Sequence, residues 1–285
     1  MTMTWQGWDG SLWNLCGGDG PSGVALAPGL RGLDAPPFQI YESESDARAG
    51  TRFRGARAQK REIFWNASVF SDTSSQGWLD YDRAFHKTLH PEKPGLFTVQ
   101  QPSGEYRTVS MRFVSSDKSW DYSPGLRGWA QYGLTFQAED PFWKGAPIVR
   151  SWGASDPVEF IDHTTGAPPF NISSSSTFDT ASMPNPGDVP AWPVWTVTAT
   201  GTVTSVTVGV NGRLVTYAGS LTSGQSLTLD SRAMTAKVGS TNVTASLTVR
   251  DWAPIPEGSE VPLTVAMTGT GTVQAVVTPN HFRAY

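Results

Sequence analysis

Apolar and polar residues alternate along most of this 285-residue chain, with the period of two that buries one face of a β-strand. In the first half, Trp65, Ala67 and Val69 are separated by the polar residues Asn66 and Ser68. The strands predicted in this half span residues 63–70, 96–100, 106–114 and 130–138. The first half is therefore expected to be rich in β-structure.

One stretch of the first half has a helical spacing instead. Its apolar residues are Trp78, Tyr81, Phe85 and Leu89. They recur every three or four residues and Pro91 ends the run, so they predict one amphipathic helix packed against the strands.

The second half repeats the strand pattern more plainly. The predicted strands are Trp195–Ala199, Val206–Val210, Leu227–Leu229, Val243–Val249 and Val261–Met267. Asn211 and Gly212 lie between two of them and form a strong hairpin signal, because both central residues of such a turn must accept a positive φ. Five or more short strands at this spacing favour an antiparallel β-sandwich.

A polar, proline-rich region around residues 150–193 separates the two halves. Within it, Ser173–Ser176 and Met183–Asp188 are not expected to hold a regular element, because prolines and glycine disrupt a ladder. We predict a long loop at about residues 165–193, at the entry to a second domain. The chain length suits two domains of about 140 residues each, which we place at residues 1–145 and 146–285.

Composition narrows the class further. Glycine numbers 29 and proline 21, while 38% of residues are hydrophobic, which is typical of short strands joined by tight turns. Cys16 is the only cysteine, so an internal disulfide and a thiolate metal cluster are excluded. The net charge of −4 gives no general attraction to nucleic acid or anionic lipid. Without a signal-peptide pattern or a long apolar run, we expect a soluble protein made in a cytoplasm, with no membrane insertion.

Catalytic motifs are weak. His86 and His90 share the spacing of a zinc-binding helix, but Lys87 stands where a hydrolytic zinc helix has glutamate, so helix-end or surface histidines are the simpler interpretation. No nucleophile elbow, phosphate loop or dinucleotide fingerprint is found in the sequence, and clustered acids alone are poor evidence for a glycosidase. We therefore predict no metal site, no cofactor and no enzymatic activity.

The sharpest charge feature is a basic run that follows an acidic one. The acids are Glu42, Glu44 and Asp46, and the basic residues are Arg48, Arg52, Arg54, Arg57, Lys60 and Arg61. A nucleic-acid groove is one reading, although Phe53 is the only aromatic residue of the run. A contact with an acidic patch of a neighbouring subunit, at Glu42–Asp46 or Asp80–Asp82, is the second, and a solvated hairpin face is the third. These nine residues are our candidates for a subunit interface.

Tryptophans of the second half suggest a further possibility. Trp195 occupies an apolar-face position, whereas Trp192 and Trp252 lie outside the regular pattern and are better candidates for exposure. Exposed tryptophans could stack on sugars, so both residues are candidates for a glycan contact.

Several short motifs follow one another in a fixed order along the chain. They are Gly29-Leu30-Arg31-Gly32-Leu33, Pro36-Pro37-Phe38, Arg61-Glu62-Ile63, Leu89-His90-Pro91, Pro94-Gly95-Leu96, Gly104-Glu105-Tyr106-Arg107, Ala138-Glu139-Asp140-Pro141-Phe142-Trp143 and Asn185-Pro186-Gly187-Asp188 with Pro190 and Pro193. Their order and spacing resemble the distal tail proteins, or minor tail proteins, of long-tailed phages, especially phages of actinobacteria. The resemblance covers nearly the whole chain.

The resemblance implies a mainly β fold of two sandwich-type domains. The N-terminal domain would be tail-tube-like with one flanking α-helix, and the C-terminal domain would be a galectin-like antiparallel β-sandwich. The resemblance also implies a homo-hexameric ring at the tail tip of the virion, made in the cytoplasm of the bacterial host.

The implied partners are the tail tube protein, the tape-measure protein and the tail-tip or receptor-binding proteins, with DNA passing through without specific binding. Six chains at −4 would carry −24 formally, which repels passing DNA if the lumen shares that sign. The basic run is therefore expected to face a neighbouring subunit or the outer rim. A carbohydrate-binding adhesin is the alternative function, and a wall-degrading hydrolase is the third hypothesis.

Overall fold

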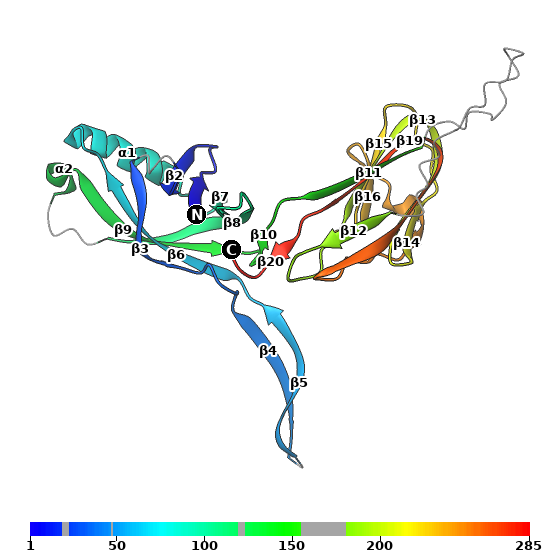
Figure 1. Cartoon of the computed structure of the whole chain (residues 1–285), viewed down its shortest axis with the longest axis horizontal. Coiled ribbons are helices and arrows are strands. Elements are labelled where there is room, and N and C mark those ends of the chain that lie inside the picture. Colours follow the sequence, from blue (N-terminus) through cyan, green and yellow to red (C-terminus); the bar gives the residue numbers. More distant parts are fainter. Residues whose placement is uncertain (19–22, 47, 119–122, 155–180) are drawn as a thin grey trace, which may run out of the picture. The chain divides into compact units, whose positions relative to one another are not determined.

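The computed structural model describes residues 1–18, 23–46, 48–118, 123–154 and 181–285, and it divides into two compact units (Figure 1). The first unit comprises Met1–Ala146 together with His281–Tyr285, and the second comprises Pro147–Asn280. The chain thus enters the second unit once and returns to the first for its last five residues. Residues 165–180 of the predicted loop, including Ser173–Ser176, lie outside the described residues. Among the described residues, no helix has the length and apolar character needed to cross a membrane.

The first unit is built mainly from antiparallel strands. They are β1 (Thr2–Gln6), β2 (Leu12–Cys16), β3 (Val24–Arg31), β4 (Phe38–Ser45), β5 (Arg48–Ala58), β6 (Arg61–Phe70), β7 (Gly95–Gln100), β8 (Tyr106–Asp117), β9 (Trp129–Ala138), β10 (Trp143–Lys144) and the boundary strand β20 (Asn280–His281). The strand order is β2-β1-β7-β8-β9-β6-β3, and β10 pairs with both β8 and β20. The mainly β prediction is confirmed, including the strands predicted at β6, β7, β8 and β9.

Four aromatic side chains from different strands of this sheet pack together in the core of the first unit. The Trp65 ring centroid is 5.3 Å from that of Trp5, 4.8 Å from that of Phe97 and 4.2 Å from that of Phe136. These four side chains come from β6, β1, β7 and β9, and each is at most 1% exposed. The alternation read from the sequence therefore directs large rings from distant strands into one core.

The predicted helix is α1 (Ser75–Lys87). It begins where the Ser74 hydroxyl accepts a hydrogen bond of 3.0 Å from the Gly77 backbone N–H, an N-cap that satisfies one free donor of the first turn. Trp78 and Phe85 are buried as expected, but Tyr81 is 41% exposed. Tyr81 lies against Gly23, where an added Cβ would come within 2.6 Å of the ring. A short second helix, α2 (Pro124–Arg127), precedes β9.

The second unit is also a layered β-structure. Its strands are β11 (Ile148–Ala154), β12 (Ser182–Asn185), β13 (Val194–Val210), β14 (Arg213–Tyr217), β15 (Ser226–Asp230), β16 (Thr235–Val238), β17 (Thr241–Asn242), β18 (Leu247–Arg250) and β19 (Ser259–Val277). The halves of β13 pair with different strands: the first half with β15 and the second with β14. Both halves pair with β19, and the register shifts between them. Two strands predicted on either side of Gly201 are thus one bent strand.

The predicted turn at Asn211 and Gly212 is confirmed. Both residues have positive φ, of 50° and 80°, and Val210 pairs with Arg213 across the turn. The backbone strain that a positive φ imposes on most residues is small for asparagine and absent for glycine.

Two details of the second unit correct the sequence interpretation. Thr244–Ser246 forms a 3₁₀ turn, η2, because Asn242 Oδ1 accepts from the Thr244 N–H at 2.9 Å and Thr244 Oγ1 accepts from the Ala236 N–H at 2.9 Å. Only the end of the strand predicted at 243–249 therefore exists, as β18. Residues 182–185, expected to be irregular, form β12. β12 pairs only with β19 among the described strands, and such an edge position tolerates Pro184.

Candidate assembly site

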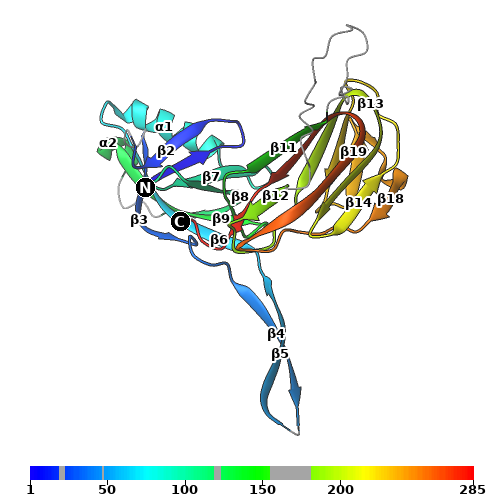
Figure 2. The same cartoon turned by 45° about the vertical axis from the view of Figure 1, so that its right-hand side comes forward.

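The most distinctive element of the first unit is a long hairpin, which we call the arm (residues 38–58, strands β4 and β5). The two strands pair only with each other among the described strands, as a separate two-stranded sheet, and the ribbon projects away from the strands β3 and β6 that it connects (Figures 1 and 2). At its base, the Gln59 N–H donates to the Pro37 carbonyl at 2.8 Å. The arm carries eight of the nine candidate interface residues within or beside it, including Arg48 at the start of β5 and Lys60 just beyond its end.

The register of the arm separates its side chains into two unlike faces. Directly paired residues share a face, and alternate residues of a strand do too. One face therefore carries the apolar and acidic residues Phe38, Ile40, Glu42, Glu44 and Phe53. The other carries Gln39, Tyr41, Ser43, Arg52 and Arg57.

A β-bulge produces this separation. Tyr41 pairs with Gly55, but Glu42 pairs with Phe53, so Arg54 is the additional residue on β5. If the strands paired without the bulge, Glu42 would pair with Arg54 and Phe53 would share a face with Arg57, because a shift of one residue moves every following side chain to the opposite face. The Arg54 Nε donates to the Ser43 hydroxyl at 2.8 Å across the bulge. The bulge thus gathers the apolar residues on one face and the paired basic residues on the other.

The arm exposes large apolar side chains to an unusual degree. The exposed fractions are 43% for Phe38, 59% for Ile40, 44% for Tyr41 and 64% for Phe53. The acids Glu42, Glu44 and Asp46 are exposed as well. An apolar stripe bordered by charge on a ribbon with no core of its own is typical of a protein contact surface.

Arg61 differs from the other basic residues, and its assignment to a subunit interface is wrong. Its side chain is 1% exposed and donates to four backbone carbonyls. Nε binds the Pro141 oxygen at 2.7 Å, and Nη1 binds the Gly32 oxygen at 2.7 Å and the Asp34 oxygen. Nη2 binds the Phe282 oxygen at 2.7 Å. Burial lowers the pKa of Arg61 to about 10, with Asp34 opposing this shift, so the group stays charged at neutral pH.

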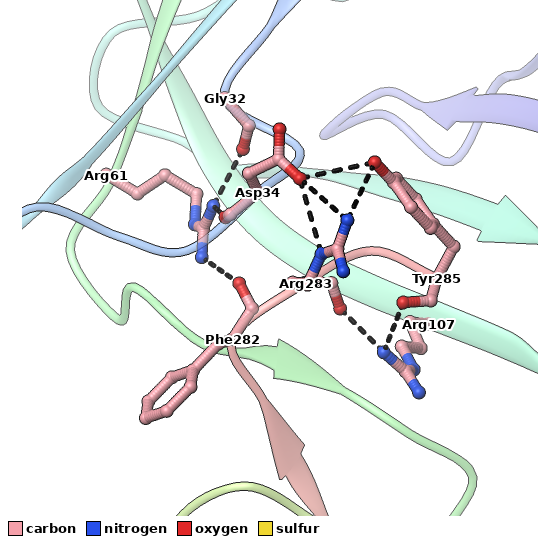
Figure 3. Close-up of polar contacts among 7 residues, drawn as sticks. All are labelled: Gly32, Asp34, Arg61, Arg107, Phe282, Arg283 and Tyr285. Carbon is pink, nitrogen blue, oxygen red and sulfur yellow. Dashed lines mark hydrogen bonds and ion pairs between the residues drawn. The ribbon is translucent and has the colours of Figure 1, made fainter.

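Around Arg61, the last five residues of the chain pack onto the base of the arm (Figure 3). We call residues 281–285 the return segment. The Ala284 N–H donates to the Leu33 carbonyl at 2.9 Å, and Ala284 is fully buried. Arg283 lies 3.3 Å from the Asp34 carboxylate, and the Tyr285 hydroxyl donates to the same oxygen at 3.2 Å. The return segment is thus fixed to the chain just before β4.

Arg107 holds the other side of the return segment. Its Nη1 donates to the Arg283 carbonyl at 2.8 Å and to the Tyr285 carbonyl at 3.1 Å (Figure 3). Phe282 also packs against two aromatic rings. The centroid of its ring lies 5.5 Å from that of Phe38 and 6.1 Å from that of Phe142. Sequence reasoning missed these contacts, because Arg61 and Phe282 are 221 positions apart and no local pattern connects them.

The two histidines with zinc-helix spacing take part in separate hydrogen bonds, and His90 lies beyond the end of α1. The His86 Nδ1 lies 2.9 Å from the Asp82 carbonyl oxygen, and the His90 Nδ1 accepts from the Glu92 N–H at 3.0 Å. In the part of the chain that the structure describes, no group of three or more His, Cys, Asp or Glu residues is arranged to hold a metal ion.

Trp252 corrects the expectation of an exposed glycan contact. It is 7% exposed and belongs to the core of the second unit, against which Trp192 also packs in a partly buried position. Because Trp252 is buried in the core, it cannot offer a free face to a sugar, whereas the glycan contact suggested for Trp192 stays a prediction. The strand end that suggested exposure for Trp252 instead turns the ring inward.

Two comparisons of the sequence point to phage tail proteins. Residues 186–279 match the family described as siphovirus-type tail component, C-terminal domain. A curated relative, minor tail protein Gp27 of Mycobacterium phage L5, is 27% identical over 142 residues, a match that covers 48% of this chain and 42% of that protein. The aligned part is therefore less than half the length of that relative.

Solved structures share the fold over almost the whole chain. The crystal structure of the Dit protein (gp 19.1) of phage SPP1 has a TM-score of 0.68 at 13% identity, covering 98% of this chain and 99% of that one. A chain of the phage p2 baseplate, in its activated conformation with Ca, has a TM-score of 0.55 at 11% identity, covering 98% of both chains.

The chain thus shares the fold of the SPP1 Dit protein over almost its whole length, and residues 186–279 match a siphovirus-type tail component. Together with the match to a mycobacteriophage minor tail protein, these findings confirm the resemblance to the distal tail proteins of long-tailed phages.

Proposed function

We propose that this chain assembles with further copies of itself into a closed ring at the distal end of the tail, and that the arm supplies much of the contact between neighbours. The arm is the observation that carries the proposal. A two-stranded ribbon is marginally stable in water by itself, yet this one holds Phe38, Ile40 and Phe53 on one face with 43% to 64% exposed. Covering that face with another chain removes apolar surface from water.

The charges of the arm favour a second copy as its occupant. Each copy offers an acidic, apolar face and a basic face on the same ribbon, so the surfaces of neighbours can be complementary in a head-to-tail order. Repeating a head-to-tail contact by a rotation that closes gives a ring. The exposed charge pairs would set the register and partner choice more than the stability.

We further propose six copies per ring, joining the tail tube to the tip, baseplate and receptor-binding proteins and leaving a channel for DNA and the tape-measure protein. The solved structures support this, since the SPP1 protein is described as a paradigm of hub adsorption apparatus and the phage p2 chain comes from a baseplate. The net charge of −4 per chain is consistent with a lumen that repels DNA. The ring would act in the virion, after synthesis in the host cytoplasm, without catalysis.

Substitution of the apolar arm face tests the proposal. Ile40→Ser and Phe53→Ser remove apolar contact but leave the hairpin charges, so we expect the self-association Kd to rise by about tenfold or more. Sedimentation velocity over a concentration series measures this change. Val249→Ser is the matched control, because Val249 is 42% exposed on a strand of the second unit. Equal association of wild type and both arm variants would count against the arm as the interface.

A further inference from the structure

We propose that the return segment is a positioning clamp that fixes the direction and order of the arm. The arm begins at Phe38 and its base is closed by Gln59 and Pro37. The contacts of the return segment fall on the chain just before this point, at Leu33 and Asp34, and on Phe38 itself. A segment from the far end of the chain thus packs at the position where a change of backbone angle would swing the whole ribbon.

The clamp joins the arm base by three different kinds of contact. The backbone bond from Ala284 to Leu33 is 2.9 Å long and buried. The Phe282 ring meets the Phe38 ring edge-on, with an interplanar angle of 89°, a favoured aromatic geometry. The ion pair of Arg283 with Asp34 lies at the surface, where screening by solvent makes it weak. The backbone bond and the ring contact therefore hold the return segment, and the ion pair adds an exposed contact beside them.

Arg61 connects the return segment to the chain just before the arm. Its guanidinium binds carbonyls of Gly32 and Asp34 before the arm, and the carbonyl of Phe282 in the return segment (Figure 3). A planar guanidinium presents its donors in a fixed fork, so a shift of one segment misaligns the bonds to the other. Arg61 itself follows the arm by three residues, after Ala58. Both ends of the arm are therefore held by the residues that hold the return segment.

A clamp of this kind matters for a ring, and this step rests on the proposed function. Neighbours in a closed ring meet at one angle, and an arm that is ordered beforehand loses less conformational freedom on binding. Without the clamp, a ribbon attached at one end would sample many directions. The clamp would thus tune assembly without contacting the neighbour.

Hydrogen–deuterium exchange of the full chain, at a dilution where it is monomeric, tests the clamp directly. In Phe282→Ala, we expect the amides of Phe38–Tyr41 and Gln59 to exchange about fivefold faster or more, since local opening becomes easier. The amides of β6 and β9 should keep their wild-type rates. Arg213→Ala is the matched control, because it removes an exposed ion pair with Asp251 in the second unit, and it should leave the arm unchanged.

A second variant guards against a general loss of structure. Arg283→Gln removes the ion pair with Asp34 and the contacts of the guanidinium with Tyr285, all within the exposed part of the return segment. The Arg283 side chain is 55% exposed, so the core stays intact. We expect a smaller increase in exchange, confined to the same arm-base amides. Wild-type exchange at the arm base in both variants would overturn the clamp. Faster exchange with unchanged self-association would overturn its role in assembly, whereas a wild-type chain that never assembles would refute the ring and leave the exchange result standing.

Discussion

At the scale of single residues, Arg61 shows how one side chain can differ from a run that it completes. It follows five basic residues in sequence, yet it is buried among backbone carbonyls while Arg52, Arg54 and Arg57 are exposed on the arm. Charge patterning could predict the run but not this difference, because burial depends on where β5 ends and β6 enters the core. A buried cation without these acceptors would be strongly disfavoured.

Replacing Arg61 should therefore destabilise the chain far more than replacing an arm arginine. Arg61→Met leaves four carbonyls without their donor, and we expect a loss of about 3 kcal/mol in the free energy of unfolding. The control Arg52→Met should change it by less than about 0.5 kcal/mol, because that side chain is exposed. Urea denaturation of both variants measures the difference. Similar losses for the two would contradict the role assigned to Arg61.

A second residue, Tyr132, makes stability depend on alkaline pH. Its buried hydroxyl donates to Asp82, and Lys118 and His86 lie beside its ring. Burial, followed by the hydrogen bond to Asp82, raises the pKa of Tyr132 above the ordinary tyrosine value. The folded state therefore favours the protonated hydroxyl, and this contribution is present below about pH 10 and lost as the pH rises further.

Tyr132→Phe should remove that loss. Above about pH 10, wild type is expected to lose stability faster than the variant, by about 1.4 kcal/mol per pH unit at most. Chemical denaturation of both proteins at pH 8, 10 and 11 measures the difference, and the other ionisable groups are common to both. Parallel stability curves for the two proteins would show that the hydroxyl ionises normally in the folded state.

At the scale of elements, the sequence predicts strands well where apolar and polar residues alternate regularly, and poorly where this alternation is interrupted. Strands β6, β7, β8 and β9 follow the period of two and were predicted within a few residues. The arm breaks the period at Arg54, so regular alternation along its sequence would place Phe53 on the face of Arg57 and not on the apolar face. The bent strand β13 was divided at Gly201 because glycine marks a turn as readily as a bend. The bulge and the bend depend on how each strand pairs with its neighbours, which the sequence of one strand alone does not determine.

Inserting one residue between Tyr41 and Glu42 tests the bulge. The inserted residue gives Arg54 a partner on β4, so β5 alternates regularly and Phe53 moves to the face of Arg57. We expect self-association to be lost, or the Kd to rise by about tenfold or more. The control Arg54→Ala keeps the bulge and should associate like wild type, within about threefold. Sedimentation velocity compares them, and equal behaviour of the two variants would show that the separation of faces is unimportant.

At the scale of the whole molecule, the two-unit plan and the mainly β fold followed from composition and pattern. The return of residues 281–285 to the first unit did not, because its contacts with Leu33, Asp34 and Arg61 bridge more than 200 positions. Likewise, exposure of Trp252 could not be inferred from its position after a strand end. The sequence indicated the arm only through its acidic and basic runs. That the hairpin projects from the sheet depends on which strands pair, which the sequence does not show.

The central claim is that copies of this chain form a closed ring through their arms. Electron microscopy of the purified full chain, with its mass measured in the same solution, tests this most directly. We predict ring-shaped particles with six-fold symmetry and the mass of six chains, and their absence in Phe53→Ser. A chain that stays monomeric at high concentration, even when tail-tip partners are added, would contradict the claim.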